Sequence, residues 1–353
     1  MAQALAIKYR PKTFDDVTEQ NEVKIILEQQ LKSGEIQHCY LFVGGAGTGK
    51  TTSARIFANE INHGQGNPIE MDAASNNSVD DMRELIQQAQ TKSLNSEYKV
   101  FIIDECHMIT TAGWNAILKL IEEPPAKSIF IFCTTDPQKI PKTIISRVQR
   151  YDFKRISQQG IVDRLTEICI RENSQNYDDP NLRDIGDIIR YDGAIEYIAK
   201  LADGGMRDAI TLLDKCLAFS HDLTMENVIK ALGTVDYDVM FELTDSLQYE
   251  NTKKAMIAIV EEIHASGKDL KTFLKQYTHF LLDIQKYAIG CDWKYINIPK
   301  LNTYVEWLKK CGTEDFDAYS RILDCCLKLN SEIKYSSSPK LDIEAAFILQ
   351  YEG

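Results

Sequence analysis

A glycine-rich octapeptide at residues 44–51, GGAGTGKT, constrains the fold of this chain more than any other feature of its sequence. It follows an apolar run at residues 40–43 that predicts a buried strand, and it opens a helix-compatible stretch that continues to residue 61. A G-x-x-x-x-G-K-[ST] pattern in this setting is typical of a phosphate-binding loop, because its glycines let backbone N–H groups surround an anion at the positive end of the following helix. The alternative is a glycine-rich turn with an incidental lysine.

The residues of this loop have predicted roles in binding a nucleotide. Lys50 would contact the β- and γ-phosphates, and the Thr51 hydroxyl would bind Mg²⁺. The predicted nucleotide contacts in this segment are Gly44, Gly45, Ala46, Gly47, Thr48, Gly49, Lys50, Thr51 and Thr52.

Strands and helices alternate along the first part of the chain. Further strand-like and helix-like stretches take turns at residues 68–72, 79–91, 99–104, 111–123 and 128–134. This alternation predicts a parallel sheet with helices on both faces. Beyond residue 155 the strand signals fade, and apolar residues from Leu270 to Ile284 keep the 3.6-residue period of a packed helix.

The composition is that of a globular protein and excludes few functions. A chain of 353 residues is long enough for two or three domains, and no run of about 18 apolar residues predicts a membrane-spanning helix. The 9 cysteines form no C-x-x-C pair, so we expect reduced core residues in a cytosolic protein. The net charge of −12 argues against nonspecific wrapping of nucleic acid but leaves room for a local basic face.

A second pattern, VFIIDECH at residues 100–107, places two acids directly after an apolar strand. In this position Asp104 would help to hold Mg²⁺ and Glu105 would polarise the attacking water, as in a Walker B motif. The alternative is a strand that ends in a solvated acidic turn, which the phosphate-binding loop earlier in the chain disfavours. His107 is interpreted as a packing or hydrogen-bonding residue with no assigned role.

Three weaker patterns also bear on the nucleotide. Thr134 and Thr135 end another buried strand, where a hydroxyl could sense the γ-phosphate, although paired threonines at a strand end are common. Arg147 follows a short predicted helix and is a surface charge unless a neighbouring subunit's nucleotide lies against it. Arg207 lies in a helix that follows two glycines and could reach back to the phosphates from a second domain.

With these patterns the sequence resembles the family of bacterial DNA polymerase III gamma/tau subunits, the ATPases of sliding-clamp loaders. Besides the phosphate-binding loop, the matching segments are KYRP at 8–11, DAASNN at 72–77, DECHM at 104–108, ILKLIEEPP at 117–125, TTDPQKIP at 134–141, SR at 146–147 and GMRDA at 205–209. The EEPP and TTDPQK segments are more specific than a Walker pair. Beyond residue 220 only helical character and length match.

The resemblance implies an α/β AAA+ P-loop module at residues 1–156, a small helical lid at 157–221 and an all-α collar at 222–353 that oligomerises. It also implies that Tyr9, Arg10 and Pro11 lie beside the adenine and ribose of ATP. Thr135, or Thr134 in its place, resembles sensor 1, and Arg207 resembles sensor 2. Arg147 resembles the arginine finger given to the next subunit. The implied catalytic set is Glu105, Lys50, Arg147, Arg207 and Thr135.

The resemblance further implies ATP and Mg²⁺ as cofactors and a pentameric ring with delta, delta-prime-like and further gamma/tau subunits. A sliding clamp and primer–template DNA would be the other partners, with no membrane. DNA would be held by its backbone, which needs phosphate contacts and no base readout. The matching positions are Asn76, Asn77, Arg83 and Lys119, although Lys119 as a solvated surface lysine stays open. We expect a cytoplasmic location in a bacterial or phage-infected cell.

The sequence departs from the family pattern in four places. Residues 62–67 replace the four-cysteine zinc module that usually follows the P-loop helix, so we predict no zinc. Val148 stands where a cysteine usually follows the Ser-Arg pair. The lid has an apparent insertion around residues 178–192. The chain stops after the collar, so we expect it to lack the tau-type tail that binds polymerase and helicase.

Three functions fit these residues. The leading hypothesis is an ATP-hydrolysing subunit of a clamp loader. The first alternative is a delta-prime-like scaffold that does not hydrolyse ATP, and the intact Lys50, Thr51 and Glu105 argue against it. The second is another AAA+ ATPase that remodels DNA junctions or protein substrates, which the EEPP segment disfavours.

Overall fold

The computed structural model describes residues 3–93, 95–174, 193–233, 237–248, 253–298, 302–314 and 316–349. The chain forms two compact units, Met1–Gly186 with Ile198–Asp214, and Asp187–Tyr197 with Lys215–Gly353. The predicted lid insertion at residues 178–192 lies outside the described residues. The division into three domains with boundaries near residues 156 and 221 remains a prediction.

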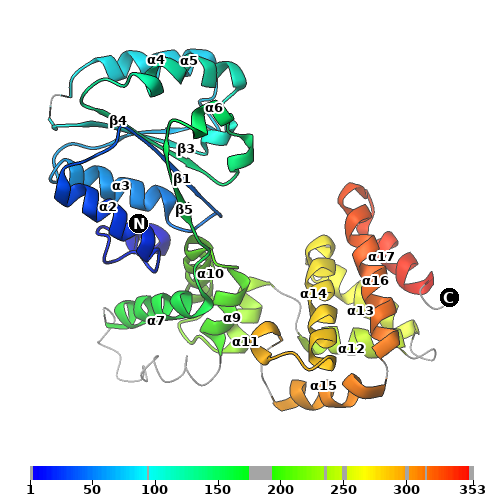
Figure 1. Cartoon of the computed structure of the whole chain (residues 1–353). Helices are drawn as coiled ribbons and strands as arrows, with labels where there is room; N and C mark the ends of the chain where they lie inside the picture. Colours follow the sequence, from blue (N-terminus) through cyan, green and yellow to red (C-terminus); the bar gives the residue numbers. More distant parts are fainter. Residues whose placement is uncertain are drawn as a thin grey trace. The chain divides into compact units, whose positions relative to one another are not determined.

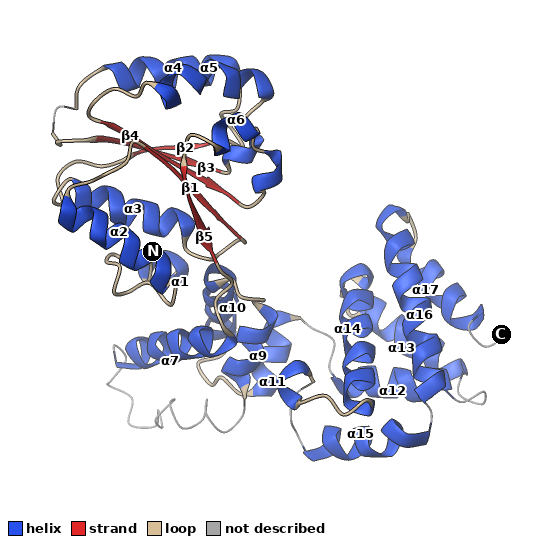
Figure 2. Cartoon of the chain, viewed as in Figure 1, coloured by secondary structure: helices blue, strands red, loops and turns tan. Residues whose placement is uncertain are grey.

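The first unit is built on a five-stranded parallel sheet, which confirms the predicted fold class (Figures 1 and 2). The strand order is β2-β3-β4-β1-β5. The strands are β1 (Cys39–Gly44), β2 (Ile69–Asp72), β3 (Lys99–Asp104), β4 (Ser128–Thr134) and β5 (Gln149–Phe153). The helices of this unit are α1 (Leu5–Lys8), α2 (Asn21–Ser33), α3 (Lys50–Ile61), α4 (Val79–Gln90), α5 (Thr111–Glu122), α6 (Lys142–Ile145), α7 (Gln158–Ser174) and parts of α9 (Ala194–Leu201) and α10 (Met206–Phe219).

Strand β5 has no counterpart among the predicted strands. It pairs with β1 alone and forms one edge of the sheet. Only Tyr151 and Phe153 of its five residues are buried, while Gln149, Arg150 and Asp152 are exposed. A strand buried on one face alternates apolar and polar residues, so this segment lacks the continuous apolar run that reveals a central parallel strand.

Alternate side chains of the strands supply two apolar layers, one on each face of the sheet. On one face Leu41 and Val43 of β1 belong to a core that includes residues of α4, α5 and α6. On the other face Tyr40 and Phe42 belong to a core that includes residues of α2 and α3. Figure 2 shows these two sets of helices on opposite sides of the red strands. The sheet is therefore covered on both faces, as the alternation of strands and helices predicts.

A short loop after α3, at residues 62–67, stands in place of the zinc module that is absent from this sequence. The buried Asn62 side chain donates a hydrogen bond to the Tyr98 carbonyl (3.0 Å) and accepts one from the Tyr98 N–H (2.8 Å). These two bonds tie the end of α3 to the start of β3. Over the described residues, His, Cys, Asp and Glu side chains form no group of three or more that could hold a metal ion.

The second unit is helical. Besides parts of α9 and α10, it contains α11 (Met225–Leu232), α12 (Tyr237–Gln248), α13 (Lys253–Ala265), α14 (Leu270–Ala288), α15 (Asn302–Glu314), α16 (Phe316–Glu332) and α17 (Pro339–Leu349). Helix α14 begins at an Asp269 cap that accepts from the N–H groups of Lys271 and Thr272. Its periodic apolar residues, from Leu270 to Ile284, are buried as predicted. None of the helices described in the chain is long and apolar enough to cross a membrane.

Candidate nucleotide-binding site

The glycine-rich loop connects the end of β1 to the start of α3. Gly47 and Gly49 have φ angles of +69° and +99°, in the left-handed region that L side chains rarely adopt. Helix α3 begins at Lys50, so its first N–H groups are free to bind an anion. These are the backbone features that a phosphate-binding loop requires, and the binding itself stays a prediction.

The Lys50 side chain is buried beside this loop. Its Nζ donates hydrogen bonds to the carbonyl oxygens of Gly44 (2.9 Å) and Gly45 (2.7 Å). Burial lowers the pKa of the Lys50 ammonium, while nearby groups that include Glu105 and Asp104 oppose that shift. A lysine in this position supplies a positive charge where the loop would enclose phosphates.

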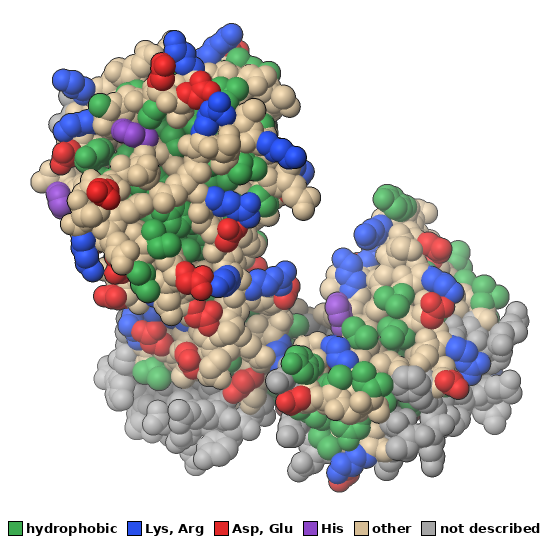
Figure 3. Space-filling model, in the orientation of Figure 1, with side chains coloured by type: hydrophobic (Ala, Val, Ile, Leu, Met, Phe, Trp, Pro, Cys, Tyr) green, Lys and Arg blue, Asp and Glu red, His purple; other side chains and the backbone are tan. Residues whose placement is uncertain are grey.

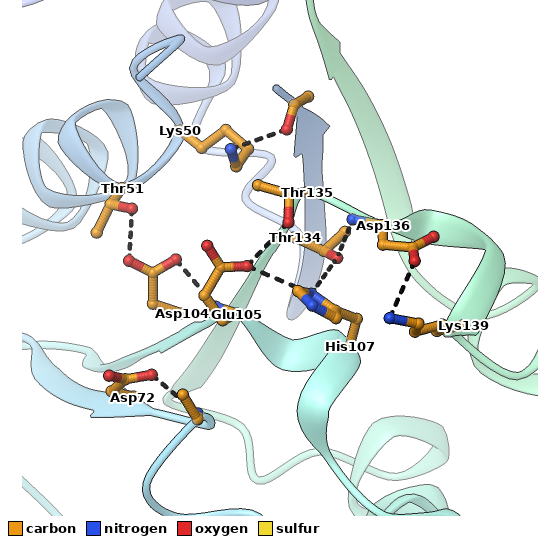
Figure 4. A network of polar contacts seen from close by, with 12 residues as sticks. Lys50, Thr51, Asp72, Asp104, Glu105, His107, Thr134, Thr135, Asp136 and Lys139 are labelled. Atoms are coloured by element: carbon orange, nitrogen blue, oxygen red, sulfur yellow. Dashed lines mark hydrogen bonds and ion pairs between the residues drawn. The ribbon is translucent and has the colours of Figure 1, made fainter. Parts of the chain in front are cut away.

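Strand β3 ends at Asp104, at the same end of the parallel sheet as the phosphate-binding loop that follows β1. The Thr51 hydroxyl donates to Asp104 Oδ2 at 2.8 Å, and the Glu105 N–H donates to Asp104 Oδ1 at 3.0 Å (Figure 4). A hydroxyl and a carboxylate side by side offer the oxygen ligands that Mg²⁺ prefers when substrate phosphates complete its shell. These two residues therefore fit the predicted magnesium site.

Glu105 follows with a φ of 47°, a left-handed conformation that is uncommon for a residue with a side chain. Its Oε2 accepts a hydrogen bond from the Thr135 hydroxyl at 3.1 Å. Thr134 is fully buried, and its hydroxyl instead accepts from the Asp136 N–H at 3.0 Å. Of the two threonines that the sequence left as alternatives, Thr135 is the one whose hydroxyl contacts Glu105 (Figure 4).

A cleft with about 1010 Å³ of empty space, part of it open to solvent, lies along this loop. Of the predicted residues, it is lined by Tyr9, Arg10, Pro11, Gly47, Thr48, Gly49, Lys50, Thr51, Thr52, Asp104 and Arg207. Residues that sequence reasoning missed also line it, namely Ala6, Val17, Thr18, Arg55, Ile156, Arg164, Met206 and Ile210. The apolar ones come from short segments far apart in the chain, so no local pattern could have revealed them.

The N-terminal segment is fixed to the wall of this cleft. The Tyr9 hydroxyl donates to Glu172 Oε1 at 2.6 Å, and Arg164 Nη2 donates to the Tyr9 carbonyl at 3.0 Å. Burial and the hydrogen bond to Glu172 raise the pKa of Tyr9 to about 12. The segment that carries Tyr9, Arg10 and Pro11 is thus held against α7. The Tyr9 hydroxyl stays protonated at neutral pH and can donate its hydrogen bond.

The start of α10 contacts the phosphate-binding loop directly. The Met206 N–H donates to the Gly47 carbonyl at 3.0 Å. Gly205 lies so close to Gly47 that a Cβ added to Gly47 would be 3.0 Å from the Cα of Gly205. The exposed Arg207 follows in the next position and lines the cleft.

Arg147 is not among the residues that line this cleft. It follows α6, where its Nε donates to Glu122 Oε1 at 2.8 Å and its Nη1 to the Thr143 carbonyl at 2.7 Å. Its side chain is 38% exposed. An exposed arginine away from its own chain's site is where an inter-subunit finger would have to lie, and that role remains a prediction.

The four predicted DNA contacts lie on or near α4 and α5. Asn76 donates its side-chain amide to the Asp72 carbonyl, and the Asn77 carbonyl accepts the N–H of Thr110, the cap of α5. Arg83 pairs with Asp80 at 2.9 Å on the exposed side of α4, and Lys119 is exposed on α5. On the face that Figure 3 shows, basic side chains lie among acidic ones, so no continuous basic surface marks a DNA site among the described residues there.

Comparison with known proteins gives consistent relatives. A family model described as DNA polymerase III, delta subunit, matches residues 67–157. The chain is 35% identical over 370 residues to DNA polymerase III subunit tau of Bacillus subtilis, covering 98% of this chain and 62% of that protein. It is 30% identical to DNA polymerase III subunit gamma of Buchnera aphidicola, covering 98% of both chains.

The shared region is often only part of the relative. The chain spans 62% of the Bacillus protein and 61% of a Mycobacterium gamma/tau subunit that is 32% identical. Among solved structures, the Thermotoga maritima RuvB Holliday junction branch migration motor is similar with a TM-score of 0.48 and 20% identity, covering 74% of this chain and 86% of that one.

Proposed function

The chain belongs to the DNA polymerase III gamma/tau family, and from this premise we propose that it is an ATP-hydrolysing subunit of a sliding-clamp loader. The observation that supports hydrolysis most directly is that the phosphate-binding loop and the acidic pair after β3 are joined by a hydrogen bond. The Thr51 hydroxyl of the phosphate-binding loop donates a hydrogen bond to Asp104 of β3. The next residue, Glu105, accepts a hydrogen bond from Thr135, which directly follows β4. Four residues from three segments thereby meet at the carboxyl-terminal ends of the strands, beside Lys50.

Each of these residues has one task in the proposed reaction. Lys50 exchanges its bonds to two loop carbonyls for bonds to the β- and γ-phosphate oxygens of ATP. Thr51 and Asp104 hold Mg²⁺, which neutralises charge on those phosphates. Glu105 accepts a hydrogen bond from the attacking water and orients it. Arg207 contacts the phosphates from the start of α10.

The remaining catalytic group comes, in this proposal, from a neighbouring subunit. Arg147 lies outside its own chain's cleft, so it would complete the site of the next subunit in a ring. An arginine finger is worth about 10³–10⁵ in rate in well-studied GTPases. Asn76, Asn77, Arg83 and Lys119 are proposed to contact the backbone of primer–template DNA. Clamp, partner subunits, DNA and a bacterial cytoplasmic location are parts of the same proposal.

A non-hydrolysing scaffold is the second candidate function. One observation favours it, because the matching family model is that of a delta subunit. That match begins at residue 67 and does not include the phosphate-binding loop. The loop, Lys50 and Glu105 are all in place here, and a scaffold would have no need of them.

The experiment is an ATPase assay of the chain assembled with partner subunits, clamp and primer–template DNA. We expect Lys50→Ala to abolish ATP binding. Arg147→Ala should retain ATP binding and lose stimulated turnover. Arg150→Ala is the matched control, because Arg150 also pairs with a carboxylate at the surface (2.6 Å to Asp152) and has a similar exposure of 41%. If the wild-type assembly does not hydrolyse ATP in a single-turnover assay, the result would favour the non-hydrolysing scaffold.

A further inference from the structure

The side chain of His107 lies against the carboxylate of Glu105. His107 Nδ1 is 3.3 Å from Glu105 Oε2 and hydrogen-bonds Thr134 Oγ1 at 3.1 Å (Figure 4). The histidine side chain is only 12% exposed, whereas that of Glu105 is 39% exposed. The contact therefore joins a nearly buried ring to a carboxylate that reaches solvent.

The neighbours of the ring indicate where its proton lies. An ionised carboxylate only accepts hydrogen bonds, so a bare lone pair on Nδ1 at this distance from Oε2 would be repelled. Thr134 Oγ1 already accepts from the Asp136 N–H and has a second lone pair. A hydrogen on Nδ1 would be donated to Thr134 Oγ1, and it would place the positive end of the N–H group, instead of a lone pair, beside Glu105 Oε2. We assign the Nδ1–H form on these grounds.

One hydrogen bond and one close electrostatic contact thus reach a single carboxylate oxygen. Thr135 Oγ1 donates to Oε2, and His107 Nδ1 lies beside the same atom. Among the described residues no hydrogen bond reaches the other oxygen, Oε1, which points away from both donors (Figure 4). One oxygen is held by the protein and the other is left to accept a hydrogen bond from water.

We propose that His107 is a positioning residue for hydrolysis, which holds Glu105 Oε2 together with Thr135 so that Oε1 receives the attacking water. This inference rests on the proposed ATPase function. His107 is itself anchored through Thr134 to the end of β4, so the rigid sheet fixes the position of the carboxylate. Holding a catalytic group in place matters because a misplacement of about 1 Å can cost about 100-fold in rate.

The test compares three substitutions of His107 in the assembled complex with clamp and DNA. His107→Asn retains an amide donor near the position of Nδ1, His107→Gln moves the donor outward toward the position of Nε2, and His107→Ala removes it. We expect the kcat of stimulated hydrolysis to fall up to about 100-fold in His107→Ala. His107→Asn should recover most of that loss and His107→Gln little of it. ATP affinity should stay within about twofold of wild type in all three, which also shows that the variants fold.

Several results would overturn this inference. Equal kcat in wild type and His107→Ala would show that the histidine is only a packing residue. A higher kcat in His107→Ala would show that it restrains Glu105 in an inactive position. Equal loss in the asparagine and glutamine variants would refute the role of the Nδ1 donor. Failure of the wild-type complex to hydrolyse ATP would refute the proposed function itself, and is thereby distinguishable from all three.

Discussion

Substitution of Gly47 by alanine tests whether the phosphate-binding loop must keep the path seen here. Gly47 has a φ of +69°, and an added Cβ would lie 3.0 Å from Gly205 Cα and 3.3 Å from the Arg207 N. An L residue in the left-handed region costs about 1–2 kcal/mol. Forcing an extra carbon into a tight contact costs about 1–3 kcal/mol more. The lower ends of the two ranges sum to about 2 kcal/mol.

This cost should appear mainly in nucleotide binding. Gly47 lies outside the strands, so we expect the loop around it to shift in the free protein without breaking the sheet. To bind ATP, the loop would then have to return to its original path around the phosphates. We expect ATP affinity to fall about 30-fold, since 1.4 kcal/mol corresponds to tenfold. Titration with a fluorescent ATP analogue measures the affinity, and thermal unfolding shows whether part of the cost falls on stability.

Another glycine of the same loop provides the matched control. A Cβ on Gly45 would meet only Thr48 Cγ2 at 3.7 Å, an ordinary contact, and Gly45 has no positive φ. Gly45→Ala should therefore bind ATP within a few-fold of wild type. Gly49→Ala tests the cost of backbone strain without a steric contact, because Gly49 has a φ of +99° and an added Cβ would meet no atom within 4 Å. Wild-type affinity and stability in Gly47→Ala would refute the reasoning, and so would equal losses at Gly45 and Gly47.

Two further substitutions test the acidic pair and the loop that stands in place of the zinc module. Glu105→Gln should bind ATP normally and lose at least about 100-fold of stimulated hydrolysis, because an amide is a poor base; turnover within a few-fold of wild type would remove Glu105 from the mechanism. Asn62→Ala should lower the free energy of unfolding by about 1–3 kcal/mol, because it leaves the Tyr98 N–H without its partner. Thermal unfolding measures this, with the exposed Asn95→Ala as control; equal stability of the two variants would contradict it.

Local sequence patterns were sufficient for the central part of the fold. Strands buried on both faces require continuous apolar runs, and the phosphate-binding loop requires glycines at fixed spacing. For this reason β1, β3 and β4, together with Lys50 and Asp104, follow from residue order alone. The edge strand β5 does not, because its single buried face leaves only Tyr151 and Phe153 as a signal.

Only the tertiary structure decided which side chains meet at the site. Thr134 and Thr135 are equivalent in sequence, but neighbouring residues at a strand end point in different directions, so one hydroxyl lies in the core and the other contacts Glu105. The same applies to His107, whose contact with Glu105 depends on the turn that Glu105 makes with its φ of 47°. The apolar wall of the cleft, which includes Val17, Ile156 and Ile210, unites segments with no local relation. Sequence determines the elements because their periods are local, whereas distances between side chains arise only when the chain folds.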